Sequence, residues 1–191
     1  MYYRQLYQFG YSHGMVPGID NEQLAKHILA HGKRASENIV STKHEDFHFP
    51  ENEQFSKVIT YIQKEFNYLN PRRMLETPTY YWSQIHEKRE SSTLHSHYNP
   101  SENYNLSGVY YVQVLEGAGD LVFNIPEGKY KTNRFQITPL VGQYFLFPSW
   151  LEHFVTKNYS ADQRISIAFN LKESAIEEFS NDGNAVTGDM G

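Results

Sequence analysis

The chain of 191 residues contains no cysteine, which excludes disulfides, thiolate metal ligands and a cysteine nucleophile and is compatible with a reducing compartment. It also lacks a run of lysine and arginine, and its formal net charge is −5, so a basic surface for nucleic acid is not expected. No apolar run approaches the roughly 20 residues of a membrane span, and the opening MYYRQLYQFG lacks the features of a secretory signal. These absences predict a cytoplasmic protein that binds neither nucleic acid nor membranes.

Aromatic residues, by contrast, are abundant. They make up 15% of the chain and include fifteen tyrosines and twelve phenylalanines, while hydrophobic residues make up 39% and charged residues 20%. This composition is typical of a globular protein, and its tyrosine content favours strands and polar-lined pockets. The length suits one domain with a substantial core. We therefore expect a single domain over residues 1–171.

Two segments early in the chain have helical spacing. The stretch from Ile19 to about Ala35 begins with polar residues and then repeats apolar residues every three or four positions. The second segment, residues 51–70, has a stronger pattern and ends at Asn70-Pro71. Its predicted apolar face consists of Phe55, Val58, Ile59, Ile62 and Phe66. Residues 1–72 are accordingly predicted to form a helical N-terminal part.

From Arg73 onward the periodicity changes to that of short strands separated by turns. The expected strands lie near Thr79–Ile85, Leu106–Val114, Asp120–Asn124, Lys129–Ile137, Gln143–Phe147, His153–Thr156 and Arg164–Leu171. Such a succession predicts a sandwich or barrel of antiparallel strands over residues 73–171. The glycine cluster EGAGD at 116–120 is expected to be a hairpin turn. Residues 172–191 lose both periodicity and apolar content, which predicts a flexible tail.

The histidines carry the functional signal. In the stretch LHSHYNP, His95 and His97 are separated by one residue, and on a strand both would project to the same side, which is a chelating arrangement. A further histidine, His153, ends the stretch FPSWLEH, and Arg164 follows eleven residues later with Ser166 on the same predicted face. Taken singly, these are compatible with solvated loop histidines, a strand-edge histidine and a surface ion pair. Their order and spacing together favour a functional site.

This combination resembles the Fe(II)/2-oxoglutarate-dependent oxygenases, whose core is a double-stranded β-helix, also called a jelly roll. That pattern has HxD or HxE on an early strand, a distal histidine on a late strand, and beyond it an arginine, often as RxS. More narrowly, the segments HSHYNPSENYNLSGVYYV, PLVGQYFLFPSWLEHFV and RISIAFN are similar to a small bacterial and cyanophage branch of these oxygenases. The resemblance covers roughly Tyr80 to Leu171. It implies a mainly β fold with N-terminal helices, an α+β protein with a cupin-like jelly-roll core.

By position, the resemblance implies that His95, His97 and His153 bind Fe(II). Here His97 stands where the superfamily has a carboxylate. Neutral imidazole is a competent ligand, so three histidines still form one face of an octahedron, but the site then keeps the full charge of the divalent cation and should prefer a dianionic co-substrate. In a second possible register, His97 is the first ligand and Asn99 or Glu102 supplies an oxygen.

The resemblance also implies residues that bind 2-oxoglutarate. Arg164 matches the arginine that pairs with its distal carboxylate, with Ser166 as a helper, because a guanidinium can donate two parallel hydrogen bonds to a carboxylate. Only one of two adjacent tyrosines can face the site, and the resemblance favours Tyr111, although packing in the core would explain it as well. Asn170 lies on the same face as Arg164 and is a further candidate for contact with the co-substrate or the primary substrate. His86 is expected to be a non-ligand.

The resulting expectation is a dioxygenase that hydroxylates a C–H bond of a small molecule or protein side chain, consumes O2 and 2-oxoglutarate, and releases succinate and CO2. A cupin-type isomerase, thiol dioxygenase or metal-binding module is the alternative, and the pair Arg164 and Ser166 at its distance from His153 discriminates against it. A structural jelly-roll protein would bind no metal. A monomer and a homodimer formed through the helical first third both fit the sequence.

Overall fold

The computed structural model describes residues 10–36, 39–41, 51–78, 80–102, 104–128 and 131–175. The helices within these residues are α1 (Asn21–His31) and α2 (Glu53–Leu69). The strands are β1 (Ser12–Met15), β2 (Lys33–Ser36), β3 (Ile39–Ser41), β4 (Arg73–Leu75), β5 (Tyr80–His86), β6 (Leu106–Gln113), β7 (Leu121–Gly128), β8 (Lys131–Ile137), β9 (Gln143–Pro148), β10 (His153–Val155), β11 (Arg164–Leu171) and β12 (Glu173–Ala175).

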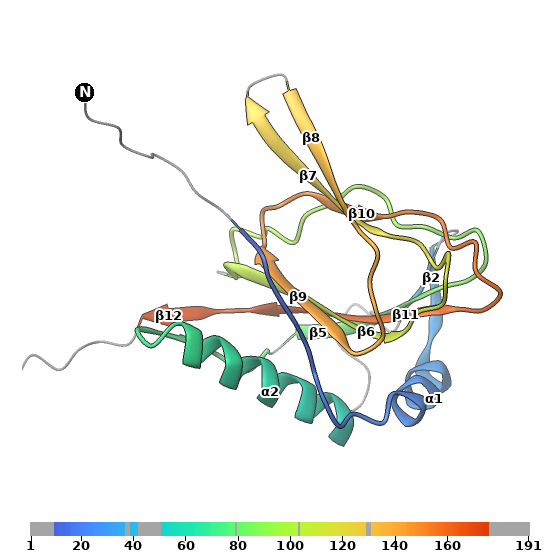
Figure 1. Cartoon of the computed structure of the whole chain (residues 1–191), viewed down its shortest axis with the longest axis horizontal. Coiled ribbons are helices and arrows are strands. Elements are labelled where there is room, and N and C mark those ends of the chain that lie inside the picture. Colours follow the sequence, from blue (N-terminus) through green and yellow to red (C-terminus); the bar gives the residue numbers. More distant parts are fainter. Residues whose placement is uncertain are drawn as a thin grey trace, which may run out of the picture.

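The strands form two facing antiparallel sheets, with both helices against the outer face of the larger one (Figure 1). The larger sheet has seven strands in the order β1-β9-β6-β11-β5-β3-β2, and the smaller has three in the order β10-β7-β8. A separate pair, β4 and β12, is also antiparallel. The expected fold class, mainly β with N-terminal helices, is confirmed.

Each helix starts at a side chain that caps its free backbone N–H groups. The Asp20 carboxylate accepts a hydrogen bond from the backbone N–H of Gln23 at 2.9 Å, and the Asn52 side chain does the same for α2. Helix α1 was expected to reach about Ala35, which is wrong at its C-terminal end. The chain turns extended at Gly32, and the next residues form β2, which pairs with β3 at the edge of the large sheet. Tertiary pairing here overrides a weak helical pattern.

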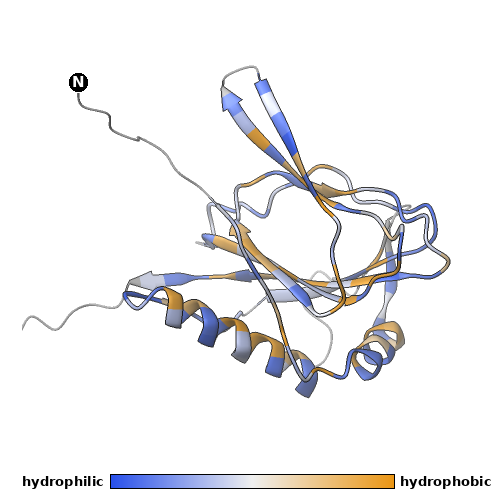
Figure 2. Ribbon diagram, viewed as in Figure 1, coloured by the Kyte–Doolittle hydropathy of each residue, from blue (hydrophilic) through white to orange (hydrophobic). Residues whose placement is uncertain are grey.

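The main hydrophobic core lies between the helices and the large sheet. Figure 2 shows the apolar faces of both helices turned toward the strands. Buried members of this core include Leu24, Ile28, Phe55, Val58, Ile62, Tyr110, Ile165, Ile167 and Phe169. Four of the five residues of the predicted α2 face are buried, and Phe66 is partly buried against them. The amphipathic pattern of α2 thus fixes which side of the sheet it covers.

A second core fills the space between the two sheets. It contains Tyr111, Leu121, Phe123, Phe145, Phe147 and Leu151. All residues of β11 are buried because the strand has a core on each side. Its isoleucines and Phe169 face the helices, and Arg164, Ser166 and Ala168 face the space between the sheets. Because β11 is buried on both faces, the charged side chain of Arg164 lies in the interior.

The EGAGD segment differs from its expected role as a hairpin turn. It joins β6 of the large sheet to β7 of the small one, so it is a crossover between sheets. Gly117 and Gly119 adopt positive φ angles of 78° and 91°. A Cβ atom on Gly119 would also lie 2.4 Å from the carbonyl oxygen of Thr156, so a glycine is required there. The glycines correctly predicted a turn, but they did not show that the turn joins strands of two different sheets.

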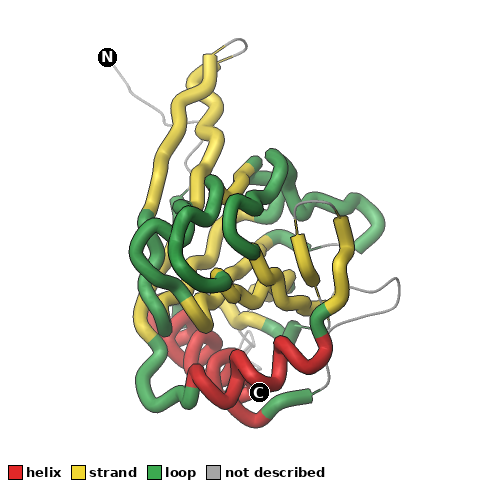
Figure 3. Tube along the Cα trace, turned by 90° about the vertical axis from the view of Figure 1, so that its right-hand side faces the viewer, coloured by secondary structure: helices red, strands yellow, loops and turns green. Residues whose placement is uncertain are grey.

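Strands β7 and β8 extend as a ribbon beyond the body of the protein (Figures 1 and 3). Strand β7 continues past its expected end at Asn124 to Gly128, and β8 is exposed along almost its whole length. The expected start of β8, Lys129, lies outside the described residues. At the other end of the chain, β12 lies within the segment expected to be a flexible tail, and residues 176–191 are not described.

Gly108→Ala is expected to lower the free energy of unfolding by about 1–3 kcal/mol, the usual cost of overpacking a core. Gly108 lies on β6, and an added Cβ would sit 2.1 Å from the ring of Phe169, which is fully buried and cannot move aside. Gly10→Ala is the matched control, since a Cβ there meets no atom within 4 Å. Urea denaturation of both variants measures the difference. Equal stability of the two would contradict the packing described for β6 and β11.

Candidate active site

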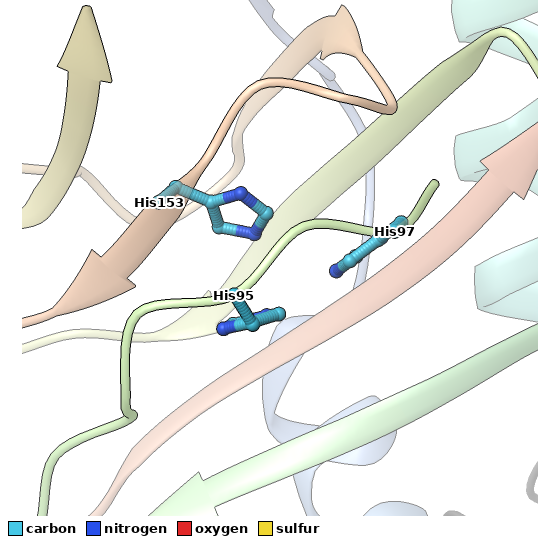
Figure 4. Close-up of side chains that lie close together, drawn as sticks. All are labelled: His95, His97 and His153. Atoms are coloured by element: carbon cyan, nitrogen blue, oxygen red, sulfur yellow. The ribbon is translucent and has the colours of Figure 1, made fainter. Parts of the chain in front are cut away.

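Three histidines meet between the sheets, close to the end of the small sheet. His153 opens β10, while His95 and His97 lie on the segment that leads toward β6. His95 and His153 form an antiparallel bridge, in which the backbone N–H of each donates to the carbonyl of the other at 3.0 and 2.8 Å. One ring nitrogen from each imidazole lies within 4.8 Å of the other two. Figure 4 shows the three rings gathered around a common space. The set is suited to a metal ion.

Hydrogen bonds at Nδ1 set the tautomer of all three rings. Nδ1 of His95 lies 2.8 Å from the carbonyl oxygen of Thr93, and Nδ1 of His153 lies 2.9 Å from that of Leu151. Nδ1 of His97 lies 2.9 Å from Oδ1 of Asn170. Because these oxygens only accept, each Nδ1 carries the proton and each ring presents Nε2 as its lone-pair nitrogen. This is the outer-shell arrangement found around metal-binding histidines.

The cluster is more deeply buried at His153 than at the other two rings. His153 is 5% exposed and packs edge-on against Phe147 with ring centroids 4.8 Å apart. Burial, followed by repulsion from the neighbouring His97 and His95, lowers the pKa of His153 to about 3. At neutral pH it is therefore a neutral imidazole, the form that binds a metal.

Arg164 occupies the deep end of the space between the sheets. Its side chain is 1% exposed, and its guanidinium stands over the ring of Tyr111 at 5.0 Å. Nη1 donates to Oγ of Ser166 at 3.2 Å and lies 3.4 Å from Nδ1 of His86. Burial lowers the pKa of Arg164, but an arginine remains charged at neutral pH. Among the described residues, no carboxylate forms an ion pair with this buried cation.

Three buried polar atoms around Arg164 lack hydrogen-bond partners among the described residues. They are Nε of Arg164 itself, the hydroxyl oxygen of Tyr111 and Nε2 of His86. Burial also raises the pKa of Tyr111, which keeps the hydroxyl protonated and able to donate. A buried cation with donors around it and no counter-ion is costly unless an anion binds. The chemistry of this end of the space fits a carboxylate.

A pocket connects the histidines to the arginine. The three histidines line one part of it, and Tyr111, Arg164 and Ser166 line another. The remaining wall is largely apolar and includes Val109, Leu121, Phe147, Val155 and Ala168. A small molecule bound here would therefore touch both the histidine cluster and the guanidinium.

Several sequence expectations can be compared directly with this geometry. Tyr111 faces the pocket, whereas its neighbour Tyr110 faces the helices and donates a hydrogen bond to Asn21 at 2.9 Å. The alternative ligands of the second register do not belong to the cluster, because the Asn99 carboxamide accepts from the backbone of Ser101 and Glu102 is exposed. Asn170 is not part of the pocket wall and contacts His97, so its contact with the co-substrate stays a prediction.

Two further residues, Gln84 and Trp82, contribute to the site and were not singled out, and they lie beside His86, which was expected to be a non-ligand. Gln84 and His86 lie on β5, where they pair with Ser166 and Arg164 of β11. Trp82 lies on the same face of β5, and its ring packs against His97 with centroids 5.2 Å apart. Alternation along β5 would have grouped these residues, but only strand order shows that β5 neighbours β11.

The buried, uncharged His86 is expected to make stability depend on pH. Burial, with a smaller contribution from Arg164, lowers the pKa of His86 from 6.5 to about 3. Between these pH values the unfolded chain binds a proton that the folded protein does not, so stability is complete above pH 6.5 and falls as pH decreases toward 3. His86→Gln should remove up to about 1.4 kcal/mol per pH unit from this dependence.

Urea denaturation of the metal-free protein at a series of pH values measures this slope. Thr132→Ala, on the exposed strand β8 and without a titratable side chain, is the control and should leave the slope unchanged. An unchanged slope in His86→Gln would show that His86 does not titrate in this way.

Two facing antiparallel sheets with a histidine cluster between them are typical of the metal-dependent jelly-roll proteins. Within that class, the model of a family described as "Putative 2OG-Fe(II) oxygenase" matches residues 80–170, which include all three histidines, Arg164 and Asn170. This segment is therefore similar to the 2-oxoglutarate/Fe(II)-dependent oxygenases, as its motifs suggested. The description of that family implies Fe(II) as the metal and 2-oxoglutarate as the co-substrate.

Solved structures share the fold. A prolyl-4-hydroxylase from Pseudomonas putida has a TM-score of 0.61 at 12% identity, covering 86% of this chain and 92% of its own. A Trichoplax adhaerens prolyl hydroxylase, in complex with a peptide fragment of hypoxia inducible factor, has a TM-score of 0.59 at 16% identity, with coverages of 85% and 83%. The epimerase SnoN, in complex with Fe3+, alpha ketoglutarate and nogalamycin RO, has a TM-score of 0.62 at 14% identity, with coverages of 88% and 82%. The shared fold is the double-stranded β-helix.

Among curated protein sequences, none matches this chain significantly. The match to this family favours the oxygenase over the cupin-type and structural alternatives. In the described part of the chain, no helix is both long and apolar enough to span a membrane.

Proposed function

We propose that this protein is a hydroxylase that uses Fe(II), 2-oxoglutarate and O2 to insert an oxygen atom into a C–H bond of a small molecule or a peptide side chain, with release of succinate and CO2. The observation that supports it most strongly is the pocket that joins three histidines to a buried arginine without a counter-ion. A metal ion would bind the histidine nitrogens at one end of the pocket, and a carboxylate would be the counter-ion of Arg164 at the other.

His95, His97 and His153 would hold the metal through Nε2. All three are neutral when their Nδ1 protons are donated to oxygen, and three neutral ligands leave the charge of a divalent cation uncompensated. A dianion is therefore a better partner for this site than a neutral ligand. The replacement of the usual carboxylate by His97 strengthens that preference.

Arg164, Ser166 and Tyr111 would bind the distal carboxylate of 2-oxoglutarate. The guanidinium can donate through Nε and Nη1, and the Tyr111 hydroxyl is a further donor without a partner among the described residues. Hydrogen bonds between charged groups in a buried site are strong, and a planar guanidinium fixes the orientation of the carboxylate. These residues would hold the co-substrate at the correct distance from the metal.

The apolar wall keeps water away from the reaction. Leu121, Phe147 and Val155 line the pocket beside the histidines and provide no competing polar group. When bound, Fe(II) with O2 and 2-oxoglutarate supplies the oxidising power for hydroxylation, which the protein's own side chains lack. The protein's contribution is thus binding, orientation and exclusion of water.

The test is O2-dependent formation of succinate. The full chain, loaded anaerobically with Fe(II), is mixed with 2-oxoglutarate and air, and succinate is followed by NMR. We expect slow succinate release from 2-oxoglutarate alone. A substrate that the enzyme can hydroxylate should accelerate this release. Two structural neighbours are prolyl hydroxylases, so peptides containing proline are the first substrates to test. Iron-loaded protein that binds 2-oxoglutarate and O2 but never forms succinate would overturn the proposal.

A further inference from the structure

We propose that Asn170 is a positioning residue that holds the His97 ring in the tautomer able to bind a metal. This inference rests on the metal site proposed above and assigns Asn170 a role other than contact with 2-oxoglutarate. His97 is the ligand that departs from the superfamily pattern, so the group that orients it is specific to this arrangement.

The contact between the two side chains is short and buried. Asn170 is 5% exposed, and its Oδ1 accepts hydrogen bonds from Nδ1 of His97 at 2.9 Å and from Oγ of Ser107 at 3.0 Å. Ser107 is fully buried on β6 and lies directly opposite Asn170 across the β6–β11 pair. Two adjacent strands of the large sheet therefore fix the amide, and the amide fixes the ring.

His97 differs from the other two histidines in what holds its Nδ1. The partners of His95 and His153 are backbone carbonyls two residues earlier in the chain, at Thr93 and Leu151. Local chain geometry thus sets those two rings. The partner of His97 is a side chain 73 residues away, so its orientation depends on β11 being in place. Of the three contacts at Nδ1, this one can be removed by substitution.

The orientation of the amide decides whether His97 can be a ligand. While Oδ1 faces the ring, Nδ1 must carry the proton and Nε2 presents its lone pair. If the amide NH2 faced the ring instead, Nδ1 would accept and the proton would move to Nε2, which blocks metal binding. The structure has the first orientation, in which Oδ1 accepts from both His97 and Ser107.

The amide also leaves the charge of the site unchanged. A carboxylate at this position would fix the same tautomer and would add a negative charge beside the metal, raising the basicity of His97. Asparagine supplies the acceptor without that charge. The pocket between His97 and Arg164 therefore stays positive when metal is bound, which favours the dianionic co-substrate.

The test uses Co(II) as the metal and 15N NMR of histidine-labelled, metal-free protein. In wild type, His97 should carry its proton on Nδ1. Asn170→Leu should shift the ring toward the Nε2-protonated form, which free imidazole side chains favour, and should weaken Co(II) binding about 10–100-fold. Asn170→Asp keeps an acceptor and should bind Co(II) at least as tightly as wild type. The same variant should bind 2-oxoglutarate more weakly.

Matched variants separate positioning from packing. Asn133→Leu makes the same change on the exposed strand β8 and should leave the Co(II) affinity unchanged. If Asn170→Leu does not fold, Asn170→Ala removes the acceptor without adding bulk and should still weaken Co(II) binding. Wild-type affinity in the Leu or Ala variant, or an Asp variant as weak as these, would overturn the inference. If wild type bound no Co(II) while His97 kept its Nδ1 proton, the proposed metal site would fail instead.

Discussion

His153→Ala is expected to abolish Fe(II) binding. His153 is the most buried of the three histidines and is bridged to His95 through two backbone hydrogen bonds, so its ring cannot be replaced by a nearby side chain. Two remaining imidazoles bind a divalent metal far more weakly than three. Isothermal titration with Fe(II) under anaerobic conditions should show no saturable site in this variant.

A loss of folding must be distinguished from a loss of ligand. His153→Gln preserves most of the side-chain volume in the pocket and should also fail to bind Fe(II) while unfolding close to the wild-type temperature. His31→Ala, on α1, should bind Fe(II) normally. Metal binding by a folded His153→Gln variant with wild-type affinity would exclude His153 as a ligand.

Arg164→Met is expected to leave Fe(II) binding intact and to weaken 2-oxoglutarate by at least about 30-fold. Removing one member of a buried charge pair commonly costs about 2–5 kcal/mol of binding free energy, because the carboxylate is left unpaired. Arg164→Lys keeps the charge and loses the planar pair of donors. Its affinity for 2-oxoglutarate should therefore lie between that of wild type and that of Arg164→Met. Arg134→Met, on the exposed β8, is the control. Calorimetric titration of 2-oxoglutarate into the Fe(II)-loaded variants measures the change.

The same substitution should not destabilise the ligand-free protein. The Arg164 guanidinium is buried without a counter-ion among the described residues, and methionine fills a similar volume without that cost. Arg164→Met should therefore unfold at or above the wild-type temperature before 2-oxoglutarate is added. Strong destabilisation would mean that Arg164 serves the fold, and unchanged 2-oxoglutarate affinity would remove it from the co-substrate site.

The core strands could be predicted because they are long and buried. Strand β11 has the predicted bounds Arg164–Leu171, and β5, β6 and β9 lie within one residue of their predicted ends. Strands β1, β2, β3, β4 and β12 were missed. They are only three or four residues long, and pairing with a partner strand defines them better than their own composition does.

The candidate site was predictable wherever neighbours in sequence are neighbours in space. His95 and His97 are separated by one residue, and alternation along β11 places Arg164 and Ser166 together. The contacts across strands had no such signal. His86 meets Arg164 only because β5 pairs with β11, and Asn170 meets His97 only because β11 passes beneath the segment that carries His97. The spacing of residues within one segment does not show which strands are neighbours in the sheet.

The most direct test of the central claim is anaerobic titration of Fe(II) with and without 2-oxoglutarate, followed by visible absorption. Chelation of Fe(II) by a 2-oxo acid gives a weak charge-transfer band. We expect the wild-type protein to show this band, and Arg164→Met to bind Fe(II) but to lose the band at the same concentration of 2-oxoglutarate. Iron binding by the wild-type protein without the band would contradict the account and favour a cupin-type metal-binding protein.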